Sequence, residues 1–152
     1  MSEATLSGAE FKKELREGKP KMGLFLNAHS PTVAEQLAHS GYDWLLVDTQ
    51  HGPMGYEKLS AMLTAISSGG AKSIVRVGGY DDRPGIQQAL DLGADGVLVP
   101  YINTVEEARQ ALRLLQFRLG KAHPTVQTLW NHFAFESAQR RQERGTRPAT
   151  LP

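Results

Sequence analysis

The stretch Trp44-Leu45-Leu46-Val47-Asp48-Thr49-Gln50-His51-Gly52-Pro53 decides the fold. Its leading apolar run is typical of a strand buried on both faces, as in a parallel sheet covered by helices. Asp48, Gln50 and His51 follow directly, and a Gly-Pro pair then ends the strand. Open α/β sheets and (β/α)8 barrels carry their chemistry at the carboxyl ends of parallel strands. The segment therefore predicts a candidate site, and a solvated strand end with a chance histidine is the alternative.

The same pattern of strand and helix recurs along the chain. Further apolar runs begin at residues 22, 73 and 96, and amphipathic helical patterns lie between them. Buried strands that alternate with amphipathic helices require parallel pairing and right-handed crossovers. We therefore expect an α/β fold, a partial (β/α)8 TIM barrel of about four βα units. A complete barrel typically needs about 250 residues, and this sequence has 152.

The sequence divides into three parts. Residues 1–21 form a polar segment with a helical pattern around Phe11, and we expect this helix to close the amino-terminal mouth of the sheet. Residues 22–115 hold the four βα units of the half-barrel. Residues 116–152 form a divergent, irregular and partly disordered tail with a formal charge of +4, from six Lys or Arg against two Asp or Glu.

Composition excludes several classes of function. The net charge of +1 does not favour binding to nucleic acid or to an anionic membrane, and the basic tail lacks a nucleic-acid-binding motif. Without cysteine the chain has no thiolate chemistry and no disulfides. The sequence shows neither a secretory signal nor an apolar run of membrane-spanning length, so we expect a cytoplasmic protein.

Four ionisable residues form the expected chemistry: two on strands, one just after a strand and one on a helix. Arg76 stands inside the buried run Ile74–Val77 and needs an anion, because an unpaired buried guanidinium is costly. That anion is Asp48 on the neighbouring strand, a substrate carboxylate, or both. His51 is a candidate general acid or base, and a carboxylate is needed to fix its tautomer. Asp91 is the candidate partner, although a polar residue in the last turn of a helix explains it as well.

Five segments of residues 22–115 together resemble the HpcH/HpaI aldolases, in matching order and spacing. The family consists of metal-dependent class II pyruvate aldolases, including the macrophomate synthase type, and its members are (β/α)8 barrels. The matching segments are Gly-Leu-Phe-Leu-Asn (23–27), Gly-Tyr-Asp-Trp-Leu-Leu-Val-Asp-Thr-Gln-His-Gly-Pro (41–53), Val-Arg-Val (75–77), Ala-Leu-Asp-Leu-Gly-Ala-Asp-Gly-Val-Leu-Val-Pro (89–100) and Val-Glu-Glu-Ala-Arg (105–109).

The resemblance implies a role for each candidate residue. His51 matches the catalytic histidine that relays a proton at the aldol hydroxyl, and Arg76 matches the arginine that binds the pyruvate carboxylate. Asp91 matches the aspartate that pairs with the histidine, and Asp48 matches the acidic residue beside it. Gln50 stands where the family usually has glutamate. We count Gln50 with Arg76 among the substrate-binding residues, with altered hydrogen bonding, for instance to a metal-bound water.

The resemblance also implies a divalent metal, Mg²⁺, Mn²⁺ or Co²⁺, as a Lewis acid that stabilises the enolate. The family's metal ligands, a glutamate and an aspartate, lie on the fifth and sixth strands, and we find no equivalent of either here. His123 and His132 match no ligand of the family. From the sequence we therefore assign no metal ligand to this chain.

Two functions remain open from the sequence. The first is a lyase that cleaves or forms C–C bonds of 4-hydroxy-2-oxo acids, with pyruvate and an aldehyde as partners. The second is a catalytically inactive, truncated half-barrel that arises as a splice variant, a frameshift product or a gene-model fragment. A half-barrel has open sheet edges and an uncovered core, so we expect it to associate, as a homo-oligomer for example.

Overall fold

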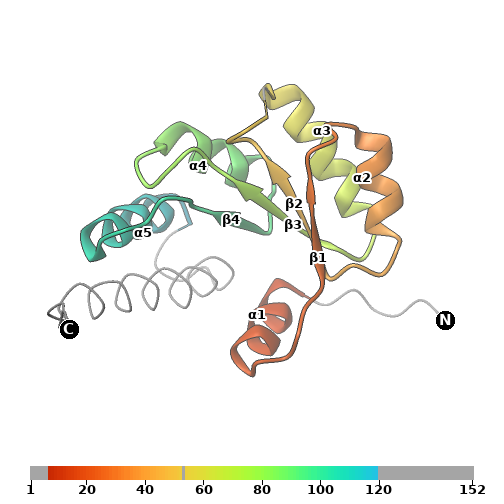
Figure 1. Cartoon of the computed structure of the whole chain (residues 1–152), viewed down its shortest axis with the longest axis horizontal. Helices are drawn as coiled ribbons and strands as arrows, with labels where there is room; N and C mark the ends of the chain where they lie inside the picture. Colours follow the sequence, from red (N-terminus) through yellow and green to blue (C-terminus); the bar gives the residue numbers. More distant parts are fainter. Residues whose placement is uncertain (1–6, 53, 120–152) are drawn as a thin grey trace, which may run out of the picture.

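A computed structural model describes residues 7–52 and 54–119 and shows a parallel four-stranded sheet with its helices (Figure 1). The sheet order is β1-β2-β3-β4, and every neighbouring pair is parallel. In chain order the elements are α1 (Gly8–Arg16), β1 (Gly23–Leu26), α2 (Pro31–Ala38), β2 (Trp44–Asp48), α3 (Tyr56–Ser67), β3 (Lys72–Arg76), α4 (Arg83–Asp91), β4 (Gly96–Leu98) and α5 (Val105–Leu119). The expected α/β fold with four βα units is confirmed as a partial (β/α)8 barrel.

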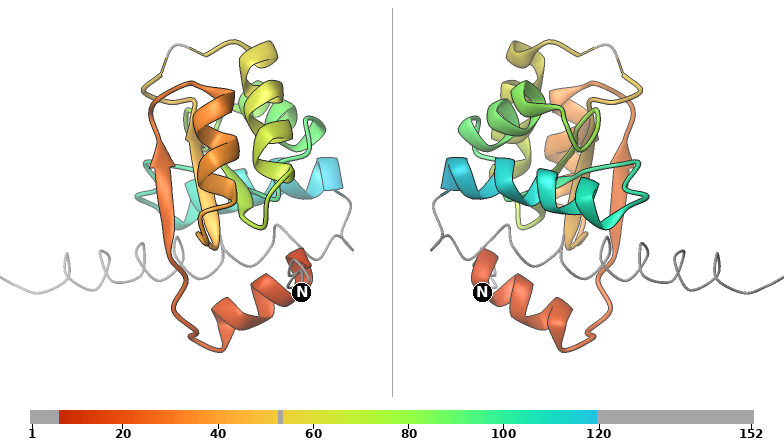
Figure 2. Two further views of the ribbon diagram at one scale, coloured as in Figure 1. Left: turned by 90° about the vertical axis from the view of Figure 1, so that its right-hand side faces the viewer. Right: turned by 90° about the vertical axis from the view of Figure 1, so that its left-hand side faces the viewer.

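The core lies between the sheet and the layer of helices α2 to α5. Leu45, Val47, Val75 and Val97 alternate along their strands and are buried in the core that the helices cover. The helices α2 and α3 cover one flank of the sheet and α4 and α5 the other, as the two views of Figure 2 show. The residues that alternate with these buried side chains along the strands, such as Arg76, belong to the opposite face of the sheet. That face corresponds to the interior of a barrel.

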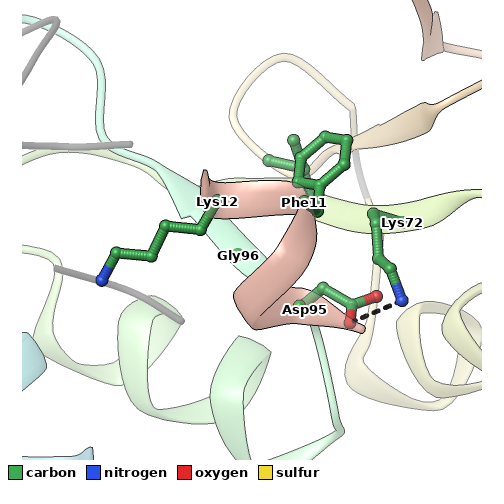
Figure 3. Close-up of a pocket in the computed structure, with 7 residues that line it drawn as sticks. Phe11, Lys12, Lys72, Asp95 and Gly96 are labelled. Atoms are coloured by element: carbon green, nitrogen blue, oxygen red, sulfur yellow. Dashed lines mark ion pairs between the residues drawn. The ribbon is translucent and has the colours of Figure 1, made fainter. Parts of the chain in front are cut away.

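The helix α1 lies at the amino-terminal edge of the sheet, as expected. Its capping box is complete, because Ser7 accepts from the Glu10 backbone N–H and the Glu10 side chain accepts from the Ser7 backbone N–H. Phe11 is buried beside Lys72 and Asp95, at the starts of β3 and β4 (Figure 3). The space left there is about 10 Å³, room for no more than one water molecule.

The carboxyl-terminal part of the described chain continues further than the sequence pattern indicates. Helix α5 ends at Leu119, so the expected boundary at Leu115 falls inside it. The rest of the expected tail, residues 120–152, lies outside the described residues. Among the helices that are described, none combines the length and the apolar character that crossing a bilayer demands.

One side chain, that of Asp82, holds the loop between β3 and α4. Its removal should therefore lower the free energy of unfolding. Asp82 caps α4 by accepting from the backbone N–H of Gly85 at 3.0 Å, and it also accepts from that of Gly78 at 2.8 Å. We expect Asp82→Ala to lower the free energy of unfolding by about 1–2 kcal/mol, since two backbone donors lose their acceptor. Urea denaturation measures this loss. The exposed neighbour Asp81 is the matched control, and an equal loss in Asp81→Ala would contradict the assignment.

Candidate active site

The carboxyl ends of β2 and β3 bring Asp48 and Arg76 side by side. The two residues are direct partners in the parallel register, so their side chains leave the same face of the sheet. Arg76 Nε donates to Asp48 Oδ1 at 2.8 Å, and Arg76 Nη2 donates to Asp48 Oδ2. This bidentate pairing matches the planar fork of the guanidinium to the two carboxylate oxygens. The ion pair that the sequence left open is therefore present.

Asp48 is held as a carboxylate by its surroundings. The Asp48 side chain is only 5% exposed, and it also accepts from the backbone N–H groups of Gln50 at 3.1 Å and His51 at 3.4 Å. The hydrogen bonds from the guanidinium, which outweigh the opposing effect of burial, lower the pKa of Asp48 to about 2. Asp48 thus fixes both the guanidinium and the start of the loop that carries His51.

His51 lies next to the guanidinium. Its Nδ1 is 3.3 Å from Arg76 Nη2. Because a guanidinium can only donate hydrogen bonds, Nδ1 is the acceptor, and the neutral ring carries its proton on Nε2. The ring of His51 therefore presents an N–H donor on the side away from Arg76. The sequence predicted a carboxylate as the partner of this ring, and the partner found is a cation.

The structure does not place Asp91 with the other candidates. Asp91 is the last residue of α4, and this helix returns from the carboxyl-terminal edge of the sheet to its amino-terminal edge. Asp95, which follows four residues later, bonds the Ser73 backbone N–H at the start of β3. Asp91 is therefore exposed at the opposite end of the sheet from His51. The helical direction explains the difference, because sequence spacing alone did not say which end of α4 faces the site.

Gln50 lies beside Asp48 and His51, and of its side-chain amide only the nitrogen is hydrogen-bonded among the described residues. Gln50 Nε2 reaches the backbone oxygen of Gly78 at 3.5 Å, a long hydrogen bond. Its Oε1 is buried and has no hydrogen-bond partner among the described residues. A buried amide oxygen without a donor costs about 1–3 kcal/mol. The position of Gln50 thus leaves an acceptor at the edge of the site.

The structure adds three residues to the site that the sequence did not reveal. Thr49 Oγ1 donates to the backbone oxygen of Arg76 at 2.6 Å and ties β2 to β3. The ring of Phe25 lies 5.5 Å from the Arg76 guanidinium carbon, within the range of a cation–π contact. The pKa of Arg76 is raised mainly by Asp48, with a smaller electrostatic contribution from Tyr101. Tyr101 also has a positive φ of 58°, which is rare for a residue with this side chain and carries no signal in the sequence.

The described residues do not make a metal centre. No three His, Asp or Glu side chains of residues 7–52 and 54–119 converge on one point. Both oxygens of Asp48 already accept hydrogen bonds from Arg76. Arg76 itself places a fixed positive charge next to Asp48, which disfavours a second cation on that carboxylate. The divalent metal that the sequence resemblance implies does not fit this set of side chains.

The loop after β2 is packed against a second histidine. A Cβ atom placed on Gly52 would clash with both Cε1 and Nε2 of His29, the residue that follows the end of β1 by three positions. The ring of His29 therefore rests directly on the backbone next to His51. Only glycine allows this approach, which fixes the loop from the side of β1.

Comparison with known proteins agrees with this fold and identifies a family. The family model described as HpcH/HpaI aldolase/citrate lyase matches residues 21–140. The chain is 39% identical over 107 residues to a hydroxypyruvate/pyruvate aldolase of Sagittula stellata, an alignment that covers 70% of this chain and 42% of that protein. The chain thus spans less than half the length of this relative.

Solved structures give the same relation. An HpcH/HpaI aldolase/citrate lyase family protein from Burkholderia cenocepacia matches with a TM-score of 0.66 and 31% identity, over 89% of this chain and 54% of that chain. Macrophomate synthase matches with a TM-score of 0.62 and 27% identity, over 78% of this chain and 40% of that one. The four βα units described here correspond to about half of each of these proteins.

The Asp48–Arg76 pair predicts a pH dependence of stability. The pKa of Asp48 falls from 3.8 to about 2 on folding. The contribution of its carboxylate to the free energy of unfolding is therefore complete above a pH of about 4 and is lost as the pH falls through about 2. The shift corresponds to about 2 kcal/mol. We expect Asp48→Asn to lower the free energy of unfolding by about that amount at neutral pH and to flatten its acid dependence between those pH values. Urea denaturation at a series of pH values measures both effects. An unchanged acid dependence in the variant would contradict the assignment.

The contact of His29 with Gly52 predicts a second effect at the site. We expect Gly52→Ala to lower the free energy of unfolding by about 0.5–1.5 kcal/mol, since the new methyl group forces the tip of the His29 side chain to move. The NMR signals of the His29 and His51 rings report the displacement. Gly55 lies in the same loop, and a Cβ atom placed on it would meet no atom within 4 Å. Gly55→Ala is therefore the control and should leave both ring signals in place.

Proposed function

Because the chain belongs to the HpcH/HpaI aldolase/citrate lyase family, we propose that it takes part in the aldol cleavage of 4-hydroxy-2-oxo acids to pyruvate and an aldehyde, or in the reverse addition. The observation that carries the proposal is the cluster of Asp48, Arg76 and His51 at the carboxyl end of the sheet. Its relatives include proteins named hydroxypyruvate/pyruvate aldolase and 2-keto-3-deoxy-L-rhamnonate aldolase, which supports this class of reaction. The aldehyde partner is left open by the residues described.

Arg76 is the group that holds the substrate carboxylate. Its Nε and one N–H of Nη2 are bound to Asp48, and the remaining Nη2–H faces His51. The two N–H groups of Nη1 have no acceptor among the contacts of the described residues, and the Arg76 side chain is 19% exposed. A guanidinium that is oriented on one side by a buried carboxylate can bind a second carboxylate on its other side. Asp48 is then a positioning residue for Arg76.

His51 is the group that exchanges a proton with the substrate hydroxyl. Cleavage removes the proton of the C4 hydroxyl, breaks the C3–C4 bond, and leaves the aldehyde and the enolate of pyruvate. In the tautomer that the Arg76 contact implies, Nε2–H can donate a hydrogen bond to a substrate oxygen. To accept the hydroxyl proton at Nε2, the ring must carry its proton on Nδ1, where the guanidinium now lies. Proton transfer to His51 therefore requires Nδ1 to exchange the guanidinium for a hydrogen-bond acceptor.

Phe25 and Tyr101 shape the surroundings of this pair. Phe25 packs against Arg76 and makes an edge-to-face contact with Trp44, with 6.3 Å between ring centres. Both Phe25 and Tyr101 have exposed aromatic surface, and Phe25 lies directly beside the Arg76 guanidinium. Aromatic surface next to an oriented guanidinium suits a small acid that has a carboxylate at one end and an apolar or carbonyl group at the other.

A divalent metal, when bound, supplies Lewis-acid stabilisation of the enolate in this class of reaction. The described side chains do not fit such an ion, so we assign no step of this chain to it. The metal ligands of the proposed enzyme therefore belong to residues beyond those described here or to another polypeptide. Assays of the proposed activity include Mg²⁺, Mn²⁺ or Co²⁺ for this reason.

The proposal predicts a turnover that depends on His51. We expect the purified chain with Mn²⁺ and a 4-hydroxy-2-oxo acid to release pyruvate, and His51→Ala to lower the rate at least about 100-fold, as is usual for loss of a general acid or base. A coupled assay for pyruvate measures the rate. His39 is exposed at the end of α2, so His39→Ala is the matched control and should keep the rate. Absence of any turnover would instead support a catalytically inactive half-barrel.

The carboxylate-binding role predicts a separate effect of Arg76. We expect Arg76→Lys to raise KM for the oxo acid more than it lowers kcat, because a lysine keeps the charge but loses the bidentate fork. Steady-state kinetics separates the two parameters. If turnover is absent, binding of pyruvate measured by calorimetry tests the same role, and equal affinity in the variant would contradict it.

A further inference from the structure

The loop that carries His51 is fixed at its start by contacts with β2 and β3. The backbone N–H and the Oγ1 of Thr49 both donate to the backbone oxygen of Arg76, at 3.1 and 2.6 Å. Asp48 accepts from the backbone N–H groups of Gln50 and His51, which closes the first turn of the loop onto the end of β2. These hydrogen bonds hold the loop as far as His51.

On the side of β1, the ring of His29 supports the next residue of the same loop. The Cε1 and Nε2 atoms of His29 each lie 2.2 Å from the position of an ideal Cβ on Gly52. Because a Cβ is bonded about 1.5 Å from its Cα, both ring atoms are in van der Waals contact with the Gly52 backbone. Gly52 directly follows His51. The edge of one imidazole therefore bears on the residue next to the other imidazole.

The backbone around His29 is itself held in place. The N–H of Ser30 donates to the backbone oxygen two residues earlier, across His29. Ser30 also caps α2, because its side chain accepts from the Val33 N–H at 3.4 Å, and Pro31 begins this helix with a restricted φ. The His29 side chain thus projects from a rigid connection between β1 and α2.

The contact between His51 and Arg76 tolerates little movement of the loop. Nδ1 of His51 is 3.3 Å from Nη2 of Arg76, and a separation of about 3.6 Å is no longer a hydrogen bond. A displacement of His51 by much less than a bond length therefore breaks the contact that sets its tautomer. The hydrogen bonds of Asp48 hold one side of His51, and the ring of His29 holds the other.

We propose that His29 is a positioning residue for His51. Its ring stops Gly52 from moving toward the connection between β1 and α2, while Asp48 and the end of β3 hold the loop from the other side. The loop backbone is thereby fixed, and the exposed ring of His51 keeps the freedom to rotate. Proton transfer needs this rotation, because Nδ1 must exchange the guanidinium for an acceptor. The catalytic part of this role rests on the function proposed for His51, whereas the support of the loop does not.

NMR relaxation of the Gly52 amide tests the support without any turnover. In the natural chain we expect an order parameter of about 0.85, the value of rigid backbone, and in His29→Ala a fall below about 0.6. His29→Phe keeps a flat ring at this place and should keep the natural value. Thr32→Ala removes an exposed side chain from the first turn of α2, so it is the matched control and should also keep that value. Circular dichroism confirms that each variant is folded.

Steady-state kinetics of pyruvate release tests the consequence for the reaction. We expect His29→Ala to lower kcat about 10- to 100-fold, as a small misplacement of a reacting group does. The KM for the oxo acid should change much less, because the carboxylate is held by Arg76. His29→Phe should restore most of kcat, since its ring packs in the same place but exchanges no proton.

Gly52→Ala tests the same contact from the loop, should His29→Ala fail to fold. Its methyl group presses against the His29 ring, so we expect kcat to fall and the NMR signal of the His51 ring to shift. Gly55→Ala should do neither, because a Cβ atom placed there meets no atom within 4 Å.

Two results would overturn the proposal. An unchanged order parameter of Gly52 in His29→Ala would mean that the loop needs no support from this ring. An equal fall of kcat in His29→Ala and His29→Phe, with the loop still rigid in the second variant, would mean that the imidazole itself exchanges a proton or binds the substrate. Absence of turnover in the natural chain would count against the proposed reaction alone, since the order parameters still decide whether His29 supports the loop.

Discussion

The bidentate ion pair of Asp48 and Arg76 is the constraint on which the site depends. It joins two adjacent strands at the residue where both end, and it supplies the buried guanidinium with the anion that it requires. The same carboxylate accepts the two backbone N–H groups at the start of the next loop, so the position of His51 follows from it. One charge pair thus sets the geometry of a binding group and of a proton-exchanging group.

This arrangement needs the repeated βα architecture around it. Buried valines and leucines on alternate positions hold β2 and β3 against the helices, which leaves the intervening positions for polar groups on the other face. The pair at the ends of the strands is therefore oriented by the core without being part of it. The same alternation places apolar side chains such as Phe25 on the inner face, where they need a covering that the described helices do not provide.

The fold was predictable from the sequence in its main features, and the site only in part. The strand around Leu45 rests on a local pattern and the pairing of Asp48 with Arg76 on the cost of burying a charge, and both are found. The pairing of His51 with Asp91 stays a prediction, and within the described residues Asp91 lies at the far end of α4 from the site. Spacing along a chain does not give the direction of a helix relative to a site unless the crossover is traced.

The sequence by itself determined the secondary structure, the parallel order of the strands and the identity of the charged residues at their ends. Hydrophobic period, glycine and proline positions and the energy of an unpaired guanidinium are properties of nearby residues, so they can be read directly from the chain. Only the tertiary structure decided that Nδ1 of His51 faces a cation, that His29 rests on Gly52 and that the Phe25 ring packs against the Arg76 guanidinium. These contacts join residues that are far apart in sequence, and they depend on ring orientation and loop path, neither of which has a local signature.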